Sequence, residues 1–331
     1  MTSTESESPI IGLVGHGVTG RRIAAKLLNN RIRVAVFDPA VSGSVRGAVV
    51  VGDTADLAVT DVVALCHPHP HSRLADEYLK AGVSVVSMSA DINDVHALVD
   101  LDEFAKQCGA ALVVGAAMSP GLTGLLADHL WRQVHVAEEL HIATHGTAGP
   151  ACAAQHHDAL GETAIGWHDG YWIERPGGSG RELDWFPEPI GAKDCYRAAL
   201  PDPILLHRIF PTASRISARA SGTRRDRLTA RLPMLTPPHA AGDIGAVRVE
   251  VRGAAEDGAR ITVIAGASGP TSELAAAVTV ACLEACLTGH LAPGVHIVGG
   301  SSIDPPSLLR RAVVLGVRLQ EFTGVARSSA W

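Results

Sequence analysis

A glycine-rich turn between a short apolar run and an amphipathic segment most constrains how this chain can fold. Residues 10–14 (IIGLV) are typical of a buried parallel strand, and the turn Gly15-His16-Gly17-Val18-Thr19-Gly20 follows directly. The next ten residues, RRIAAKLLNN, have helical periodicity. A strand, a G-x-G-x-x-G turn and a helix in this order predict a phosphate-binding cradle at the start of the helix.

Each glycine of the turn has a physical role in that prediction. Gly15 makes the tight turn, Gly17 lets the backbone approach a pyrophosphate, and Gly20 lets the helix pack closely on the strand. A second apolar run, residues 33–37, ends at Asp38, whose carboxylate can accept hydrogen bonds from ribose hydroxyls. The pattern therefore predicts NAD as the cofactor, with NADP as the alternative, since a 2′-phosphate would meet the charge of Asp38.

The alternation of strands and helices continues through the first 115 residues. Strands are expected at 47–51, 61–66, 83–88 and 111–115, with helices at 71–82 and 94–109. This order predicts an α/β fold, a Rossmann domain with a doubly wound parallel sheet. Loops after the strand ends should line the cofactor crevice, which makes His67, Pro68, Ser89 and Met118 further candidate cofactor contacts.

The second half of the chain predicts a mixed α+β domain. Strands are expected at 139–146, 181–186, 246–253 and 259–267, in an antiparallel sheet with one wet face. A long buried helix (271–289), a closing helix (305–316) and a final strand (317–322) follow. The expected organisation is a disordered tail (1–9), a dinucleotide-binding domain (10–130), a substrate and dimerisation domain (131–290) and a C-terminal return onto the first domain (291–331).

Composition excludes several classes of protein. The chain has 331 residues and 47% hydrophobic residues, enough for about two domains. A net charge of −6 argues against nucleic-acid or anionic-membrane binding, and no apolar run reaches the ~18 residues of a membrane span. Six scattered cysteines without a C-x-x-C motif, and a first segment unlike a signal peptide, predict a reduced, cytoplasmic protein. The alternating His67, His69 and His71 lack a companion thiolate or carboxylate, so no metal is expected.

Residues 115–130 (GAAMSPGLTGLLADHL) resemble the saccharopine dehydrogenase-like NAD(P)-binding oxidoreductases through Pro120, Gly121 and Leu122. The resemblance implies a dinucleotide domain, a mixed substrate domain and a C-terminal return, in a family that includes amino-acid and opine-type dehydrogenases. Ala117 stands where a second glycine is common. Two departures matter, because residues 88–91 (MSAD) carry neither the acidic Gly-Glu motif of saccharopine reductases nor the Glu-Lys-Pro of sugar dehydrogenases. Neither a substrate nor a catalytic lysine is therefore carried over.

Candidate acid–base groups lie in the second half. The segment from Thr147 to Pro150 precedes a predicted helix whose free amides could hold a carboxylate. One turn on, His157 is the favoured proton-transfer group, with Asp158 as the acid that tunes it and His156 beside it. Lys193 is the only lysine after residue 106 and is the second choice. Ordinary surface histidines and a surface lysine are the alternative interpretation.

Two compositional clusters leave their roles open. The stretch from Arg208 to Arg231 holds seven arginines and one acid, and predicts either a grip on a carboxylate or phosphate or a solvated helix face. Six of the thirteen aromatic residues lie between Trp167 and Tyr196, as expected of a substrate wall, a dimer face or a local core.

Together these features predict an NAD(P)-dependent dehydrogenase or reductase that works as a cytoplasmic homodimer. It would transfer a hydride between the nicotinamide and a small polar, carboxylate-bearing substrate of the amino-acid or imine type. Two alternatives remain: a catalytically silent dinucleotide-binding sensor or assembly protein, and a transferase that uses tightly bound NAD as a helper.

Overall fold

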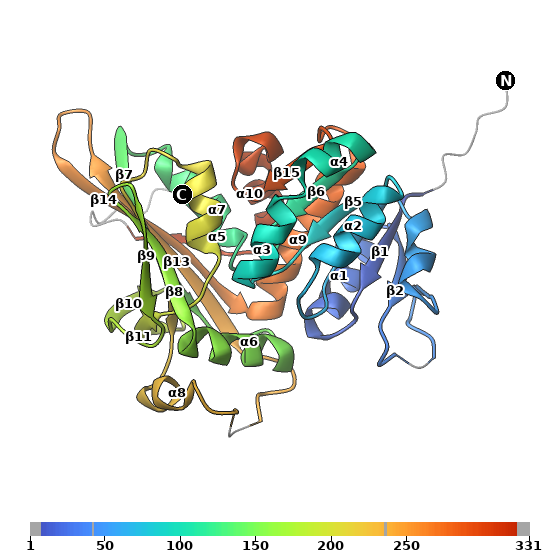
Figure 1. The fold of residues 1–331 in the computed structure, drawn as a ribbon, viewed down its shortest axis with the longest axis horizontal. Coiled ribbons are helices and arrows are strands. Elements are labelled where there is room, and N and C mark those ends of the chain that lie inside the picture. The colour runs from blue at the N-terminus through green and yellow to red at the C-terminus, as the bar shows by residue number, and fades with distance from the viewer. Residues whose placement is uncertain (1–7, 42, 235–236, 323–331) are drawn as a thin grey trace, which may run out of the picture.

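The chain folds into two β-sheets with helices between and around them (Figure 1). The computed structural model describes residues 8–41, 43–234 and 237–322. The tail expected at 1–9 therefore lies mostly outside the described residues. Within the described ranges, no helix combines the length and apolar character needed to cross a membrane.

The first sheet is parallel throughout and confirms the predicted Rossmann fold. Its strand order is β15-β6-β5-β4-β1-β2-β3. Its central strands are almost fully buried runs of valine, leucine and alanine, as a sheet covered on both faces requires. The strands are β1 (Ile10–Val14), β2 (Arg33–Phe37), β3 (Val49–Val50), β4 (Val62–Leu65), β5 (Ser84–Ser87), β6 (Ala111–Val114) and β15 (Gly294–Ile297).

The elements of the first half differ from the predicted ones in one helix and one strand. The segment 94–109 was expected to be one helix, but it forms two, because the chain turns at Asp100 and Leu101. The strand expected at 47–51 is likewise reduced to two residues. The helical elements here are α1 (Val18–Asn29), η1 (Thr54–Val59), α2 (Ser72–Lys80), α3 (Ile92–Val99), α4 (Asp102–Cys108) and α5 (Leu122–Trp131).

The second sheet has nine strands and is mixed. Its main path is β10-β11-β12-β7-β13-β14-β16, and β8 pairs with both β12 and β9. Four of these strands, β8, β9, β11 and β12, were not predicted from the sequence. The bounds are β7 (Val136–His145), β8 (Thr163–His168), β9 (Tyr171–Pro176), β10 (Glu182–Phe186), β11 (Gly191–Arg197), β12 (Arg215–Ser221), β13 (Ile244–Ala254), β14 (Arg260–Pro270) and β16 (Leu319–Glu321).

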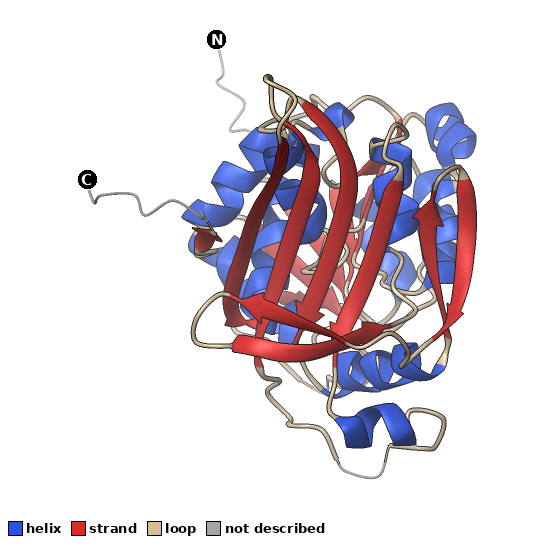
Figure 2. Ribbon diagram, turned by 90° about the vertical axis from the view of Figure 1, so that its left-hand side faces the viewer, coloured by secondary structure: helices blue, strands red, loops and turns tan. Residues whose placement is uncertain are grey.

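The two faces of this sheet differ in chemistry. The inner face carries buried apolar residues such as Leu140, Ile142 and Val249, which join the main core with α5. The outer face carries charged residues such as Arg219 and Glu250. Figure 2 shows this outer face turned to the viewer with the helices behind it. The predicted charged face is therefore present, but the sheet is not antiparallel as expected, because β12 pairs with β7 in parallel, and Glu250 on the outer face is buried in its ion pairs instead of facing solvent.

The last helices connect the two sheets. The remaining helical elements are α6 (Pro150–Gly161), α7 (Asp202–Ile209), α8 (Arg224–Thr229), α9 (Thr271–Leu287), η2 (Ser301–Ile303) and α10 (Pro305–Val314). The expected boundary at residue 290 assigned α9 to the second domain, whereas α9 packs against α1 and α10 as well as β14. Of the expected C-terminal return, β15 extends the parallel sheet and β16 pairs with β14 in the other.

Candidate functional site

The glycine turn at the start of α1 is closely built except at one point. Gly15 has a positive φ of 101°, and a Cβ on it would lie 2.8 Å from the backbone of Cys66 and His67. A Cβ on Gly20 would lie 2.2 Å from the Gly15 carbonyl oxygen. By contrast, among the residues that the structure describes, no atom lies within 4 Å of the Cβ position of Gly17, and no side chain caps the helix that begins after it. The first turn of α1 therefore has amides without a side-chain cap, and the space beside Gly17 is open.

Asp38 lies against the same turn. Its Oδ2 accepts a hydrogen bond from the His16 amide at 2.6 Å, and its Oδ1 accepts one from the Ala40 amide at 2.8 Å. Each carboxylate oxygen can accept a further bond, and the side chain remains partly accessible. The two amides thus fix the orientation of a carboxylate that still has acceptor capacity for ribose hydroxyls.

Two histidines beside the turn have unpartnered ring atoms. His16 Nδ1 and His67 Nε2 are buried and have no hydrogen-bond partner among the described residues. Burial lowers the pKa of both rings, so both are neutral near pH 7. A buried polar atom without a partner is uncommon and often marks a ligand position. The cradle therefore fits a polar cofactor with hydrogen-bonding groups on either side of the glycine turn.

His71 is part of the structure that supports this loop. It is 1% exposed, its Nε2 donates to the His67 carbonyl oxygen at 2.8 Å, and its Nδ1 accepts from Ser87 Oγ at 2.9 Å. Burial, and then the neighbouring His67, lower the pKa of His71 to about 4. The buried Asp94 accepts hydrogen bonds from the amides of His71 and Ser72. In the part of the chain that the structure describes, no three potential ligands group as a metal site would need.

The other predicted cofactor contacts differ in accessibility. Pro68 is exposed, Val18 and Thr19 are half-buried in the first turn of α1, and Ser89 and Met118 are 3% and 6% exposed. The Ser89 amide donates to Ser87 Oγ. Ser89 and Met118 therefore lie under the loops that follow β5 and β6 instead of projecting from them.

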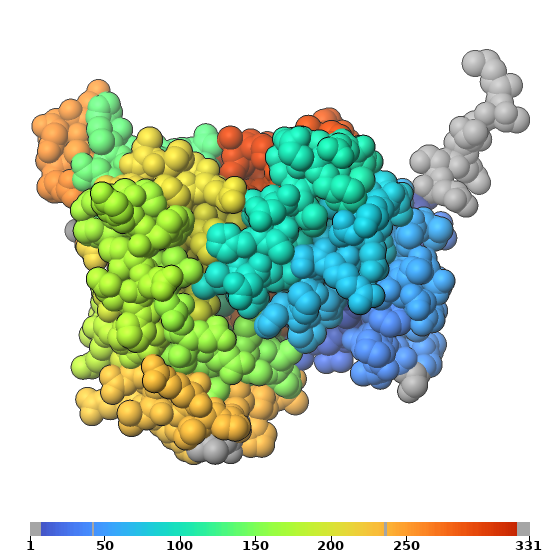
Figure 3. All heavy atoms as spheres, viewed as in Figure 1, coloured from blue at the N-terminus to red at the C-terminus, as the bar shows by residue number. Residues whose placement is uncertain are grey.

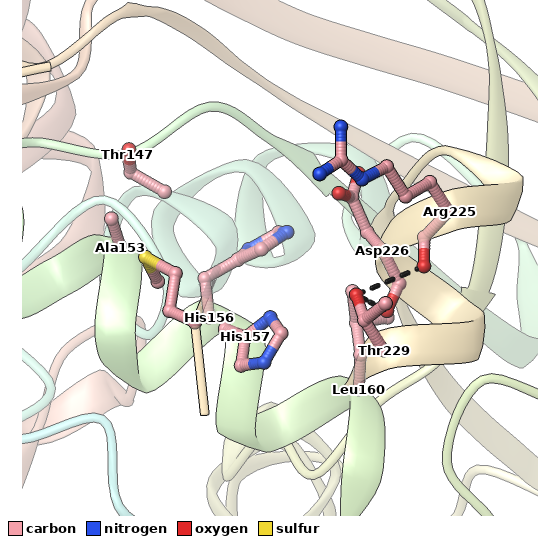
Figure 4. A pocket seen from close by; sticks show the side chains of 9 residues that line it. Thr147, Ala153, His156, His157, Leu160, Arg225, Asp226 and Thr229 are labelled. Atoms are coloured by element: carbon pink, nitrogen blue, oxygen red, sulfur yellow. Dashed lines mark hydrogen bonds between the residues drawn. The ribbon is translucent and has the colours of Figure 1, made fainter. Parts of the chain in front are cut away.

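A polar pocket of about 180 Å³ opens between α6 and α8 (Figure 4). Histidine side chains from α6 face arginine, aspartate and threonine side chains from α8. The lining residues are Thr147, Ala153, His156, His157, Leu160, Arg225, Asp226, Thr229 and Met234. Two of the predicted acid–base residues, His156 and His157, thus share one pocket.

Hydrogen bonds fix the tautomers of these two histidines. His157 Nε2 donates to the Leu232 carbonyl oxygen at 2.9 Å, and His156 Nε2 donates to the Ser221 carbonyl oxygen at 2.9 Å. A carbonyl only accepts, so in each neutral ring Nδ1 carries the free lone pair. Burial lowers the pKa of His156, opposed by its hydrogen bond to Ser221 and by the charge of Asp226. Burial thus disfavours protonation of His156, and in both rings Nδ1 is the nitrogen with the free lone pair.

The structure does not bring the other two predicted catalytic residues into this pocket. Asp158 follows His157 on α6 but is exposed, and its side chain makes no hydrogen bond or ion pair within the described ranges. Neighbouring positions on a helix point in different directions, and the carboxylate that lines the pocket with the histidines is Asp226. Lys193 lies opposite Asp184 on the outer face of β11, whereas Tyr196 on the inner face packs against α6.

The start of α6 touches the start of α1. A Cβ on Gly149, which precedes Pro150, would lie 2.8 Å from Val18 Cγ2. Figure 3 shows the green surface of α6 meeting the blue surface of the first domain. The helix that carries His156 and His157 therefore begins beside the first residue of α1, next to the glycine turn.

Arg225, Asp226 and Thr229 line the pocket, and the sequence alone did not identify them as candidates. They lie on α8, about 70 positions after the histidines, and only the fold brings the two helices together. The arginine-rich stretch 208–231 was the available signal. It indicated a grip on an anion without saying which of its seven arginines would face a pocket.

Comparison with solved structures places the chain in a known fold. Apo saccharopine dehydrogenase (L-Glu forming) from Saccharomyces cerevisiae matches 96% of this chain and 100% of its own, with a TM-score of 0.69 and 15% identity. A mutant meso-DAP dehydrogenase from Clostridium tetani, in a structure with DAP, matches 91% of this chain and 98% of its own, with a TM-score of 0.52 and 16% identity. No protein-family model and no curated protein matches the sequence. At these identities the likeness establishes the fold, and it confirms the predicted saccharopine dehydrogenase-like architecture.

Proposed function

We propose that this chain is an NAD(P)-dependent oxidoreductase that acts on a small polar, carboxylate-bearing substrate of the amino-acid or imine type. The observation that carries the proposal is the meeting of two features. An open, uncapped glycine turn lies at the start of α1, and the helix that touches it carries two histidines into a polar pocket. Cofactor and proton-transfer group would thus come from adjoining elements.

The residues of the cradle suit a dinucleotide. The amides after Gly17 would hold the pyrophosphate, Asp38 would accept from the adenosine ribose, and His16 and His67 would supply the unpartnered ring nitrogens. The bound nicotinamide would supply hydride exchange. The chain itself has to position the substrate and handle the proton.

The pocket residues suit that second task. His157 Nδ1 has a free lone pair because Nε2 is committed to the Leu232 carbonyl oxygen, so His157 would accept the proton from the substrate heteroatom. Arg225 would pair with the substrate carboxylate through its guanidinium fork. The amides at the start of α6 are a further carboxylate site.

The names of the similar structures support the choice of substrate class. Both are dehydrogenases, one is described as L-Glu forming, and the other contains DAP. From this likeness of fold we favour C–N over C–O chemistry. The cytoplasmic location and the homodimer stay predictions, and size-exclusion chromatography with light scattering would measure the oligomeric state.

Turnover of NADH tests the proposal. The wild type is assayed with a panel of 2-oxo acids paired with ammonia or amino acids, and NAD reduction is followed in reverse with the corresponding amino acids. We expect His157→Ala to lower turnover by about 10²–10⁴ with unchanged cofactor affinity, as for loss of a general acid–base group. His96→Ala, an exposed histidine on α3, is the matched control and should keep full turnover.

The alternatives give different results. Loss of turnover in Lys193→Ala instead of His157→Ala would assign the proton to the other candidate. Tight NAD binding without net NADH turnover on any substrate would contradict the oxidoreductase proposal. This result would favour a catalytically silent dinucleotide-binding sensor. If the protein also transfers a group while the bound NAD stays unchanged, it would favour the transferase.

A further inference from the structure

The outer face of the second sheet holds an arginine cluster that the proposed function does not use. Arg197 on β11 and Arg219 on β12 are directly opposite in the antiparallel register. Directly opposite side chains lie on the same face, and like charges in that position are destabilising. Their inner neighbours, Tyr196 and Ala220, pack toward α6, so the two guanidinium groups lie on the side away from the pocket.

The turn before β10 brings the two guanidinium groups closer together. Arg219 Nη1 donates to the Gly180 carbonyl oxygen. A Cβ on Gly180 would lie 1.9 Å from Arg197 Nη1, so that guanidinium lies directly against Gly180. Both groups therefore gather at one glycine with a positive φ of 61°, where a side chain would displace Arg197.

Two further arginines share this face. Arg215 lies four residues before Arg219 on β12, opposite His168, which in turn pairs with Tyr171. Arg175 lies four residues after Tyr171 on β9 and has the same orientation, because alternate residues of a strand share a face. Burial, and then the charges of Arg219, Arg175 and Arg215, lower the pKa of Arg197, as expected of four neighbouring guanidinium groups.

The protein supplies too few carboxylates to balance the cluster. Glu182 pairs with Arg219 at 2.7 Å. Glu139 lies opposite Arg215, but its carboxylate already bonds to His141 at 2.9 Å. Among the described residues, Arg175, Arg197 and Arg215 form no ion pair. Even with both glutamates counted, four guanidinium groups against two carboxylates leave two positive charges in excess.

We propose that these four arginines form a binding site for a small phosphate-bearing ligand, separate from the cofactor cradle. Guanidinium forks match phosphate oxygens in bidentate geometry, and a phosphate dianion balances the two excess charges where a single carboxylate would not. The ligand would relieve the repulsion between Arg197 and Arg219 that the sheet register imposes.

Calorimetric titration with inorganic pyrophosphate tests the site. The protein is first saturated with NAD, so that pyrophosphate does not enter the glycine turn, and ionic strength is matched with NaCl. We expect one site per chain, weakened about tenfold or more in Arg197→Gln, since hydrogen bonds to charged groups contribute at least that much. Arg175→Gln, at an exposed position, should weaken binding several-fold and cannot be attributed to misfolding.

The control variant is Arg33→Gln, which removes an exposed arginine from the start of β2, and it should bind like the wild type. If the wild type gives no binding heat, or if Arg197→Gln and Arg175→Gln both bind pyrophosphate as tightly as the wild type, the proposed site is overturned. If citrate binds as tightly as pyrophosphate, the proposal that the ligand bears phosphate is overturned. A change of oligomeric state in Arg197→Gln without loss of pyrophosphate binding would overturn it in favour of a contact between copies.

Discussion

At the scale of single residues, three glycines and one acid of the cofactor cradle have separable roles. Gly15 and Gly20 are required by close backbone approach, because a Cβ on either would overlap the chain. Gly17 is different, since the space around it is open and a ligand can use it. Asp38 is held by two backbone amides, so its charge stays in one place beside that space. Cofactor choice should therefore depend on this carboxylate.

We predict that the protein binds NAD about tenfold or more tightly than NADP, because the 2′-phosphate would meet the Asp38 carboxylate. Asp38→Asn keeps the side-chain shape and removes the charge, so it should narrow the difference between the affinities for NAD and NADP. Calorimetric titration with each cofactor measures the two affinities. Arg46→Gln is the companion variant, since Arg46 is exposed nearby in sequence and could pair with the phosphate. Equal or tighter NADPH binding by the wild type would contradict the prediction.

At the scale of elements, a buried polar network joins the loop after β4 to β5, α2 and α3. His71 connects the His67 carbonyl to Ser87, and Asp94 on α3 accepts from the first amides of α2. The network requires a neutral His71, because Nδ1 has to accept from Ser87. Protonation of this ring would therefore remove support from the cofactor loop.

Acid should destabilise the protein through His71. The unfolded chain binds a proton at this ring below about pH 6.5, whereas the folded chain binds it only below about pH 4. Between these values the unfolded state binds more protons, so stability falls as the pH falls, by up to about 1.4 kcal/mol per pH unit. Urea denaturation at pH 7 and at pH 5 measures the free energy of unfolding. Its fall between the two pH values should be about 2 kcal/mol smaller in His71→Asn than in the wild type. The free energy of unfolding of His96→Asn should fall as much as that of the wild type. An equal fall in His71→Asn would refute the role of His71 in the acid sensitivity.

At the scale of the whole molecule, the two halves meet where two helices begin. Gly149 at the start of α6 leaves no room for a side chain against Val18 at the start of α1. α9 and β15 then return from the second half to pack on α1 and to extend the parallel sheet. The position of the pocket relative to the glycine turn therefore depends on a close contact between distant parts of the sequence.

We predict that Gly149→Ala weakens NAD binding about fivefold or more, because its methyl group presses on Val18 and overpacking of this kind costs about 1–3 kcal/mol. Val18→Ala in the same chain should restore most of the affinity by removing Cγ2. Gly52→Ala, at a glycine with only one atom near its Cβ position, is the matched control. A failure of Val18→Ala to rescue would mean that the loss comes from the poorer helix start alone.

The sequence by itself determined the parallel sheet, the glycine turn and the position of Asp38, because these depend on short-range patterns: a strand, a turn and a helix within 30 residues. It also placed His156 and His157 on one helix. Only the tertiary structure decided what those residues face. The pocket joins α6 to α8 across about 70 residues, and the arginine cluster depends on the register of strands β8, β9, β11 and β12, which alternation alone did not predict. Strand pairing and helix packing join residues that are far apart in sequence, and no local pattern records which partner each one meets.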